Sequence, residues 1–240
     1  MKAILLSAGL GTRLKPITDS IPKCLVPVGP KPIIDTWLGL FERAGVEEVL
    51  INLHHHPDLV RRHLGRREGK IVIRTVYEKE LLGSLGTVLA NKSFYAGESE
   101  VLIVYVDNFA FIDFRQFAAF HAGHTFPMTV GVFETPTPKE CGIIELDREG
   151  TVVGFEEKPQ NPRSNLANAG IYLIDTGFLN GWSDDPGTGT RDIGFHFLPR
   201  SVGRMKAYRV EPFFHDIGTI ERLRKANAEY EQHASLFAES

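Results

Sequence analysis

Short runs of apolar and β-branched residues recur along the chain, separated by longer segments in which apolar residues have helical spacing. This alternation predicts an α/β protein with a mixed, mostly parallel central sheet and helices on both of its faces. Several of the runs are apolar throughout rather than alternating, which is typical of strands buried on both faces. The predicted strands cover residues 2–7, 48–53, 71–76, 101–106, 128–134, 142–147, 152–157, 169–175 and 206–212.

Two segments between the strands have the apolar spacing of core-facing helices. Residues 32–44 carry apolar side chains three or four positions apart, and Gly45 ends the pattern. Asp113 is a capping residue in front of a second such segment, residues 114–121. The polar residues 183–190 follow neither pattern and predict an exposed insertion.

The second half of the chain adds antiparallel elements. Residues 142–158 predict a hairpin, because two strand-like runs flank the turn sequence at residues 147–150. A final helix is expected from about Thr219 to Tyr230, and we expect the chain after Gln232 to fray.

Composition and charge exclude several classes of protein. With 240 residues, 42% of them hydrophobic and 24% charged, the chain has the size and composition of one large globular domain. Lys and Arg number 27 against 30 Asp and Glu, so the chain lacks the basic field that nucleic-acid or membrane binding needs. The longest apolar stretch, residues 101–106, is far shorter than the roughly 20 residues that span a bilayer. Cys24 and Cys141 match no zinc pattern and indicate free thiols, so we expect a cytoplasmic protein.

A small-residue loop follows the first predicted strand and carries the clearest chemical signal. Gly9 and Gly11 stand where an α/β sheet presents backbone N–H groups, and only glycine lets the backbone approach a phosphate closely. Two cations, Arg13 and Lys23, follow in the same region. These residues predict a site for a phosphate-containing ligand.

Two common nucleotide motifs do not fit. The dinucleotide fingerprint needs a third glycine where the chain has Leu14, and an acidic residue after the second strand, where residues 52–54 read Asn-Leu-His. The P-loop needs a Gly-x-x-x-x-Gly-Lys spacing, and residues 83–87 have neither that spacing nor the lysine. A dinucleotide-dependent dehydrogenase and a P-loop kinase are therefore excluded.

The full string around the loop is more specific. Residues 9–18 read Gly-x-Gly-Thr-Arg-Leu-x-Pro-x-Thr, and residues 22–28 read Pro-Lys-x-Leu-x-Pro-Val. This string resembles the signature of the sugar-1-phosphate nucleotidyltransferases, also called NDP-sugar pyrophosphorylases. The likeness covers nearly the whole chain, because it continues in order at residues 82–87, 106–108, 156–159, 168–172 and 214–219.

The resemblance implies a Rossmann-like nucleotide-diphospho-sugar transferase fold in a single nucleotidyltransferase domain, residues 1–240. The nucleotide-binding part is expected at about residues 1–110, and the sugar-phosphate-binding part, with its small antiparallel sheet, at about residues 111–220, before a final helix at about 219–232. The family's reaction, of the EC 2.7.7 type, joins a nucleotidyl group from a triphosphate to a sugar 1-phosphate and releases pyrophosphate, in nucleotide-sugar and polysaccharide biosynthesis.

The resemblance also implies roles for cations and carboxylates. Because the attacking phosphate is already anionic, the reaction needs charge stabilisation rather than a base. By resemblance, Arg13 contacts the triphosphate, and Lys23 reaches the phosphate at which bonds exchange. Mg²⁺ is the implied cofactor, held by Asp107 at the end of a strand and by Asp216 ahead of the last helix.

Further positions of the family pattern imply contacts to the two substrates. The implied nucleotide contacts are Ala8, Gly9, Gly11, Thr12, Glu80, Gly83, Gly86 and Thr87, with Glu78 as the alternative to Glu80 at the edge of the base. The implied sugar-phosphate contacts are Gly142, Glu157, Lys158 and Asn168. In this group Lys158 pairs with the phosphate, and Glu157 binds sugar hydroxyls.

The identity of the substrates is less determined than the reaction. The short form and residues 77–83 look most like guanylyltransferases for mannose or manno-heptose 1-phosphate, so GTP is favoured. The alternatives are uridylyl or thymidylyl transfer to another sugar 1-phosphate, and cytidylyl transfer to a non-sugar phosphate such as phosphocholine. A non-catalytic nucleotide-sugar sensor would be expected to have lost a cationic or metal-binding residue. Members of the family often form dimers or higher assemblies, which makes a homodimer the implied assembly.

Overall fold

The structure is a computed structural model that describes residues 1–182 and 191–237, so the insertion predicted at residues 183–190 lies outside the described residues. The chain forms two compact units, each built from segments far apart in the sequence. We call the first unit 1 (Met1–Leu81, Val104–Phe114 and Pro212–Ser240) and the second unit 2 (Leu82–Ile103 and Arg115–Glu211).

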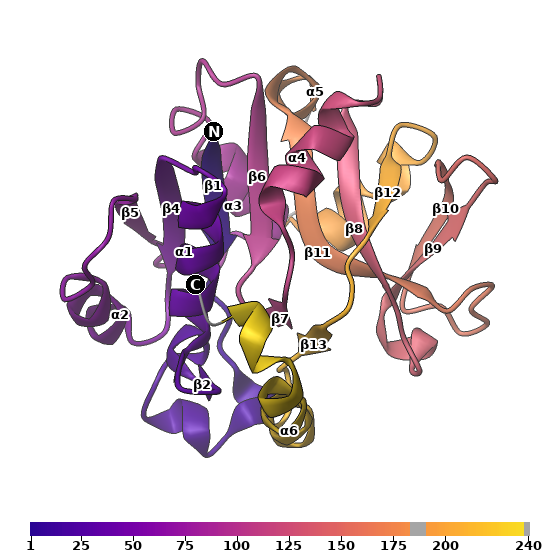
Figure 1. The fold of residues 1–240 in the computed structure, drawn as a ribbon. Helices are drawn as coiled ribbons and strands as arrows, with labels where there is room; N and C mark the ends of the chain where they lie inside the picture. Colours follow the sequence, from indigo (N-terminus) through magenta and orange to yellow (C-terminus); the bar gives the residue numbers. More distant parts are fainter. Residues whose placement is uncertain (183–190, 238–240) are drawn as a thin grey trace. The chain divides into compact units, whose positions relative to one another are not determined.

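Unit 1 contains a parallel sheet with the strand order β1-β4-β5. β1 spans Lys2–Leu6, β4 spans Glu48–Leu53 and β5 spans Val72–Tyr77. Helix α1 (Ile33–Arg43) covers one face of this sheet (Figure 1), and α2 (Pro57–Leu64) lies in the crossover that parallel strands require. The three strands and the first helix are thereby confirmed to within one residue at each end.

The buried face of α1 explains why this segment folds as a helix. Ile33, Trp37 and Phe41, spaced one turn apart, are all fully buried. The rings of Trp37 and Phe41 stack with centroids 6.2 Å apart, and the Trp37 indole N–H donates to the carbonyl of Val106 at 3.1 Å. The indole therefore keeps a hydrogen bond inside an apolar core.

Two pairs of very short strands complete the strands of unit 1. β2 (Pro27–Val28) pairs with β3 (Lys31–Pro32), and β7 (Asn108–Ala110) pairs with β13 (Phe214–Asp216), both antiparallel. The sequence analysis predicted none of these four strands, because two or three residues are too few to show a period. The β7–β13 pair matters for the site, since it places Asp216 opposite Asn108.

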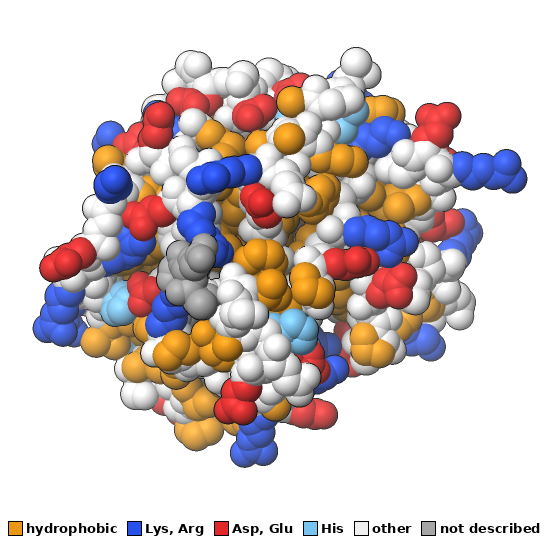
Figure 2. Space-filling view, viewed as in Figure 1, with side chains coloured by type: hydrophobic (Ala, Val, Ile, Leu, Met, Phe, Trp, Pro, Cys, Tyr) orange, Lys and Arg blue, Asp and Glu red, His pale blue; other side chains and the backbone are white. Residues whose placement is uncertain are grey.

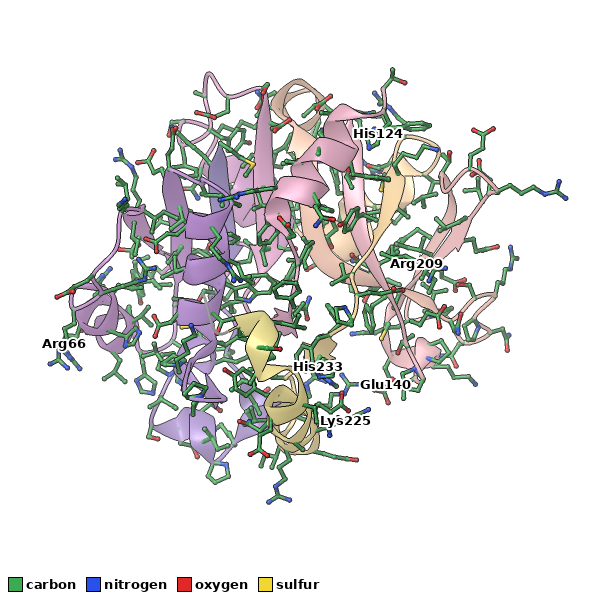
Figure 3. All side chains as sticks on the ribbon, in the orientation of Figure 1. Arg66, His124, Glu140, Arg209, Lys225 and His233 are labelled. Carbon is green, nitrogen blue, oxygen red and sulfur yellow. The ribbon has the colours of Figure 1, made fainter. Side chains whose placement is uncertain are left out.

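The last helix, α6 (Ile220–Phe237), is longer than expected, so the prediction of fraying after Gln232 is wrong for residues 233–237. Phe237 is 2% exposed, and its ring meets the ring of Phe213 edge-on at 5.6 Å. His233, labelled in Figure 3, contacts the same Phe213 ring at 5.3 Å. Burial of these rings stabilises the final turns of the helix.

Unit 2 is largely antiparallel. Its strands are β8 (Met128–Glu134), β9 (Gly142–Leu146), β10 (Val152–Glu157), β11 (Leu166–Asp175) and β12 (Lys206–Arg209), and β6 (Glu100–Tyr105) contributes residues to both units. β10, β9, β11 and β8 pair antiparallel in that order, and β12 pairs parallel with β8. The predicted hairpin is confirmed, since Gly150 donates to the Asp147 carbonyl at 3.2 Å in the turn between β9 and β10.

Three helices accompany these strands: α3 (Ser84–Ala90), α4 (Phe114–Ala122) and α5 (Thr176–Asn180). The second predicted helix corresponds to α4. Its Phe117 is fully buried and meets the ring of Tyr208 on β12 edge-on at 5.2 Å. This contact packs α4 against the strands of unit 2.

The surface carries charges of both signs. Figure 2 shows Lys and Arg side chains dispersed among Asp and Glu on the visible face rather than collected in one basic patch. None of the described helices combines the length and the apolar character needed to cross a bilayer. Cys24 and Cys141 are free thiols, as predicted, and burial raises the pKa of Cys24 to about 11, so it stays protonated at neutral pH.

Candidate active site

The loop after β1 is shaped by Gly11 and is open beside Gly9. Gly11 has a φ of +64°, and a Cβ there would lie 2.8 Å from Cγ2 of Thr18, so glycine is required. The Thr18 hydroxyl donates to the Gly11 carbonyl at 2.8 Å and fixes the turn. A Cβ at Gly9 would meet no atom of the described residues within 4 Å. An anion can therefore approach the backbone at Gly9.

Lys23 is a buried cation that is paired with a carboxylate. It lies in a short 3-10 helix, Lys23–Leu25, and is 7% exposed. Its Nζ donates to Oδ2 of Asp107 at 2.5 Å. A buried ammonium group is costly unless it is paired, so this ion pair holds both side chains in place.

Asp216, the second predicted metal ligand, lies next to the backbone of Asp107. The N–H of Ile217 donates to the Asp107 carbonyl at 3.0 Å. Oδ1 of Asp216 accepts from the N–H of Gly218 at 2.6 Å, and Oδ2 accepts from the guanidinium of Arg222. The strand pair β7–β13 thus brings the backbones of the two predicted metal ligands side by side, although they are far apart in the sequence.

Arg13, which follows the glycine loop, lies beside Gly218 together with Asp216. A Cβ built on Gly218 would lie 2.9 Å from Nη2 of Arg13 and 2.8 Å from Oδ1 of Asp216. The guanidinium and the carboxylate therefore flank Gly218 on the side where any other residue would carry its side chain. Unit 1 thus assembles two predicted cations, Arg13 and Lys23, with two predicted carboxylates.

The two carboxylates fit a hard divalent cation. Mg²⁺ takes oxygen ligands and is commonly bound by one or two carboxylates, with phosphate oxygens and water in the remaining positions. Asp107 and Asp216 are such a pair. Within the described part of the chain, no group of three or more His, Cys, Asp and Glu side chains is arranged to hold a metal ion. Two carboxylates would leave the remaining coordination positions of such an ion to phosphate oxygens and water.

Arg222 is a site residue that the sequence analysis missed. It lies in the first turn of α6, where its backbone N–H donates to the hydroxyl of Thr219 at 3.2 Å. Thr219 thereby caps the helix. The arginine stands in the sequence six positions after the predicted ligand Asp216, at the start of the expected last helix.

A buried polar network joins the ends of β1, β4 and β5. Oδ1 of Asn52 accepts from the N–H of Ser7 at 2.6 Å, and Nδ2 of Asn52 donates to Oε1 of Glu78 at 2.9 Å. Glu78 is 5% exposed, whereas Glu80 is exposed. Glu78 and Glu80 are the two glutamates predicted for the edge of the base. Glu78 is buried and hydrogen-bonded to Asn52, whereas Glu80 lies at the surface.

The predicted nucleotide-binding segment of unit 2 is bonded to Arg191. The N–H groups of Leu85 and Gly86 both donate to the Arg191 carbonyl, at 3.1 and 3.2 Å. Gly83 permits this approach, because it has a φ of +78° and a Cβ there would lie 2.1 Å from the Arg191 oxygen. The segment and Arg191 therefore form one hydrogen-bonded element.

Ser84 and Asp192 extend this pairing through their side chains. The Ser84 hydroxyl donates to Oδ2 of Asp192 at 2.9 Å and accepts from the N–H of Ile193 at 2.8 Å. Thr87 is buried, and its hydroxyl donates to the Gly83 carbonyl at 3.0 Å, which stabilises the first turn of α3. The sequence analysis missed Asp192, since a lone acidic residue after a polar insertion gives little signal.

Glu157 is a carboxylate held against two glycines. A Cβ on Gly142 would lie 2.6 Å from Oε2 of Glu157, and a Cβ on Gly194 would lie 2.8 Å from it. Burial raises the pKa of Glu157, the positive charge of Lys158 lowers it, and the negative charge of Asp192 raises it. The two glycines leave this carboxylate the space that larger residues would fill.

Glu157→Gln is expected to increase the free energy of unfolding at neutral pH. The pKa of Glu157 is higher in the folded protein than in the unfolded chain. At a pH between these two pKa values, the folded protein therefore binds more protons than the unfolded chain does. The free energy of unfolding of the wild type falls as the pH rises through this range. Glutamine has no charge to desolvate. Thermal unfolding of both proteins between about pH 4 and 8 should show a gap in Tm that widens with pH; a gap independent of pH would contradict this assignment.

Lys158 and Asn168 are fixed by local hydrogen bonds. Lys158 follows β10 with a φ of +51°, which is rare outside glycine, and its N–H donates to the Cys141 carbonyl at 3.0 Å. Nδ2 of Asn168 donates to the hydroxyl of Tyr172 at 2.7 Å, and its Oδ1 accepts from the N–H of Gly170 at 3.0 Å. The orientation of the Asn168 amide is therefore set on both sides.

The predicted site residues fall into two groups, one in each unit. Unit 1 holds Ala8, Gly9, Gly11, Thr12, Arg13, Lys23, Glu80, Asp107 and Asp216. Unit 2 holds Gly83, Gly86, Thr87, Gly142, Glu157, Lys158 and Asn168. Of these, the structure brings Arg13, Lys23, Asp107 and Asp216 together in unit 1, and Gly142 and Glu157 together in unit 2.

Comparison with solved structures identifies the fold. A crystal structure from Bacillus anthracis, of a candidate glucose-1-phosphate thymidylyltransferase, matches with a TM-score of 0.81 at 24% sequence identity, over 95% of this chain and 94% of that chain. The predicted fold is confirmed: it is the nucleotide-diphospho-sugar transferase fold, with a mixed, mostly parallel sheet and accompanying helices.

The family is shown by the sequence comparison. The family model described as nucleotidyl transferase matches residues 2–233, and the chain therefore belongs to this family, as its motifs predicted. The chain is 28% identical to glucose-1-phosphate adenylyltransferase of Fervidobacterium nodosum, over 94% of this chain and 60% of the relative. It is 29% identical to mannose-1-phosphate guanylyltransferase catalytic subunit beta of Drosophila melanogaster, over 90% of this chain and 59% of the relative. The chain thus spans about 60% of the length of these curated relatives.

Proposed function

We propose that this protein transfers a nucleotidyl group from a nucleoside triphosphate to a sugar 1-phosphate and releases pyrophosphate. The observation that carries this proposal is the assembly in unit 1 of Arg13, Lys23, Asp107 and Asp216 beside a glycine loop. Membership of the nucleotidyl transferase family supports it, as do the names of the curated relatives. The free thiols favour a reducing compartment, the cytoplasm, as the setting.

The residues of unit 1 serve the triphosphate. An oxygen of the sugar phosphate attacks the α-phosphorus in line, and pyrophosphate leaves from the opposite side. Arg13 and Lys23 place positive charge there, which offsets repulsion between the two anions and stabilises the charge of the transition state. The open backbone at Gly9 receives phosphate oxygens. Mg²⁺, held by Asp107 and Asp216, would supply further neutralisation of these oxygens when bound.

The residues of unit 2 serve the sugar phosphate. Lys158 supplies a cation for its phosphate, and the carboxylate of Glu157 accepts hydrogen bonds from sugar hydroxyls. Gly142 keeps space open beside that carboxylate. Asn168, fixed by Tyr172, presents its amide in one orientation and so adds a directed polar contact to the sugar.

The substrates that we propose are GTP and mannose or manno-heptose 1-phosphate. Guanine presents two adjacent N–H donors on one edge, and a single carboxylate accepts both, whereas adenine and uracil lack this pair. Glu80 is an exposed carboxylate, and Glu78 is tied to Asn52, so we assign the edge of the base to Glu80. A mannose-1-phosphate guanylyltransferase subunit is among the curated relatives, at 29% identity, beside a glucose-1-phosphate adenylyltransferase at 28%.

Pyrophosphate release across a grid of substrates tests the proposal. The purified protein is incubated with Mg²⁺ and with each of GTP, UTP, dTTP, CTP and ATP against mannose, manno-heptose, glucose and amino-sugar 1-phosphates, with phosphocholine as a non-sugar acceptor. We expect the highest rate with GTP and mannose or manno-heptose 1-phosphate. A higher rate with another triphosphate would overturn the choice of base, and activity confined to phosphocholine would overturn the choice of acceptor.

A further inference from the structure

Both oxygens of Asp216 are already engaged by donors of the protein itself. The N–H of Gly218 donates to Oδ1 at 2.6 Å, and the guanidinium of Arg222 donates to Oδ2. A backbone N–H does not neutralise a carboxylate, whereas a guanidinium does. Arg222 therefore supplies at Asp216 the positive charge that a metal ion would otherwise supply.

The pairing at Asp216 differs from the pairing at Asp107. Lys23, which pairs with Asp107, has a side chain only 9% exposed and is held within the protein. Arg222 and Asp216 are 28% and 29% exposed, so water surrounds this pair in part. Partly exposed ion pairs contribute little net stability and are readily exchanged. Of the two pairs, the one with Arg222 is the one that a cation from solution can open.

We propose that Arg222 is a built-in counter-cation, which holds Asp216 in the metal-free protein and is displaced when a divalent cation binds that carboxylate. This inference rests on the metal site of the proposed function. Both cations are attracted to the Asp216 carboxylate, and the repulsion between them favours release of the partly exposed Arg222 when the metal binds. Arg222 is a positioning residue in this step, because it holds the Asp216 carboxylate that binds the metal and does not bind the metal itself.

The guanidinium of Arg222, once displaced, can bind the phosphates of the triphosphate. It is bonded to Asp216, which flanks Gly218 together with Arg13, and Arg13 is the residue predicted to contact the triphosphate. A guanidinium donates two parallel hydrogen bonds to phosphate oxygens, so it suits this ligand better than an ammonium does. Metal and phosphate binding are then coupled: the metal releases Arg222, and Arg222 joins the cations that bind the phosphates.

Binding of Mn²⁺ without nucleotide tests the first part, measured on the full chain from the electron paramagnetic resonance signal of free Mn²⁺. Arg222→Leu removes the competing cation and is expected to bind Mn²⁺ about twofold to fivefold more tightly than wild type, the range that a partly exposed ion pair supports. Arg224→Leu is the matched control, because it removes an exposed arginine two positions away on the same helix. Its affinity should not change.

Binding of inorganic tripolyphosphate in the presence of saturating Mn²⁺ tests the second part. This probe lacks a base, so the result does not depend on the choice of nucleotide. Arg222→Leu is expected to bind it about tenfold more weakly than wild type, the effect of losing a hydrogen bond between charged groups. Opposite changes in the two affinities distinguish displacement from a general loss of folding, which would weaken both.

Asp216→Asn separates failure of this inference from failure of the proposed function. If Asp216→Asn binds Mn²⁺ as wild type does, the proposed metal site itself is wrong. If Asp216→Asn loses Mn²⁺ but Arg222→Leu binds it equally or more weakly than wild type, the counter-cation role is overturned and the metal site stands. Tighter Mn²⁺ binding by Arg222→Leu with unchanged tripolyphosphate binding would overturn the transfer to phosphate.

Discussion

Asp107→Asn and Asp216→Asn are each expected to lower nucleotidyl transfer by about 10³-fold or more. Both changes replace a proposed anionic metal ligand with a neutral amide of the same shape. A bound divalent ion contributes several kcal/mol of charge stabilisation in such reactions, and about 4 kcal/mol corresponds to this factor. Pyrophosphate release at saturating triphosphate and sugar phosphate measures the effect, and raising the Mg²⁺ concentration should restore little of it.

The two variants should differ in stability, which provides an internal check. Asp107→Asn removes the carboxylate that pairs with Lys23, and Lys23 is only 7% exposed, so a buried ammonium loses its counter-ion. Asp216→Asn removes a carboxylate whose partner Arg222 is partly exposed and can turn to water. The Tm should therefore fall more for Asp107→Asn than for Asp216→Asn, while both lose activity.

Asp58→Asn is the control for loss of a surface carboxylate. Asp58 pairs with Arg61 at 3.1 Å, and both side chains are well exposed, so activity and Tm should remain close to wild type. Near wild-type rates of both variants at limiting Mg²⁺ would contradict the prediction. The metal would then have to be held by other residues, and Asp107 and Asp216 would have no role in the chemistry proposed for unit 1.

The strands and helices that the sequence predicted are those whose residues follow a recognisable pattern, either a nearly unbroken apolar run or an apolar spacing of one helical turn. β4 is apolar and nearly all buried, and α1 has a buried face with one-turn spacing, so the bounds of both follow from local pattern. β7 and β13 have three residues each, and they exist because their segments meet in unit 1. The final turn of α6 likewise depends on the burial of Phe237, which no local pattern encodes.

The site was predictable where backbone geometry demands particular residues. Gly11 and Gly83 were predicted because they belong to the family's motifs, and the structure shows the physical reason: each has a positive φ and lies against neighbouring atoms that exclude a side chain. Arg222 and Asp192 were missed because a charged residue on a helix or after a loop is common, and only the folded chain shows what it pairs with. The sequence did not distinguish Glu78 from Glu80, because the bond from Asn52 to Glu78 exists only in the folded chain.

Gly83→Ala is expected to lower the free energy of unfolding by about 2 to 4 kcal/mol, through backbone strain together with a steric clash. Gly83 has a φ of 78° and a ψ of 164°, a region that only glycine populates readily. A Cβ there would lie 2.1 Å from the Arg191 oxygen and 2.7 Å from its carbonyl carbon. Both are backbone atoms, so no side-chain rotation relieves the contact. For a chain of this size the Tm should fall by about 5 to 15 °C.

Gly97→Ala is the matched control for this change. Gly97 also belongs to unit 2 and has a φ of +87°, yet a Cβ there would meet no atom of the described residues within 4 Å. It therefore carries the conformational cost of a positive φ without the clash, and the difference between the two Tm values isolates the effect of the contact with Arg191. Equal losses in the two variants would show that the segment yields to the methyl group.

Gly83→Ala should also impair function beyond its effect on stability. The added methyl group pushes the segment from Arg191, which breaks the hydrogen bonds that Leu85 and Gly86 donate to the Arg191 carbonyl. Ser84, which bonds Asp192, then loses its position as well. The value of kcat/KM for the triphosphate is measured well below the Tm of each variant. It should fall at least tenfold for Gly83→Ala and little for Gly97→Ala. Only Gly83→Ala moves the segment that is proposed to bind the nucleotide.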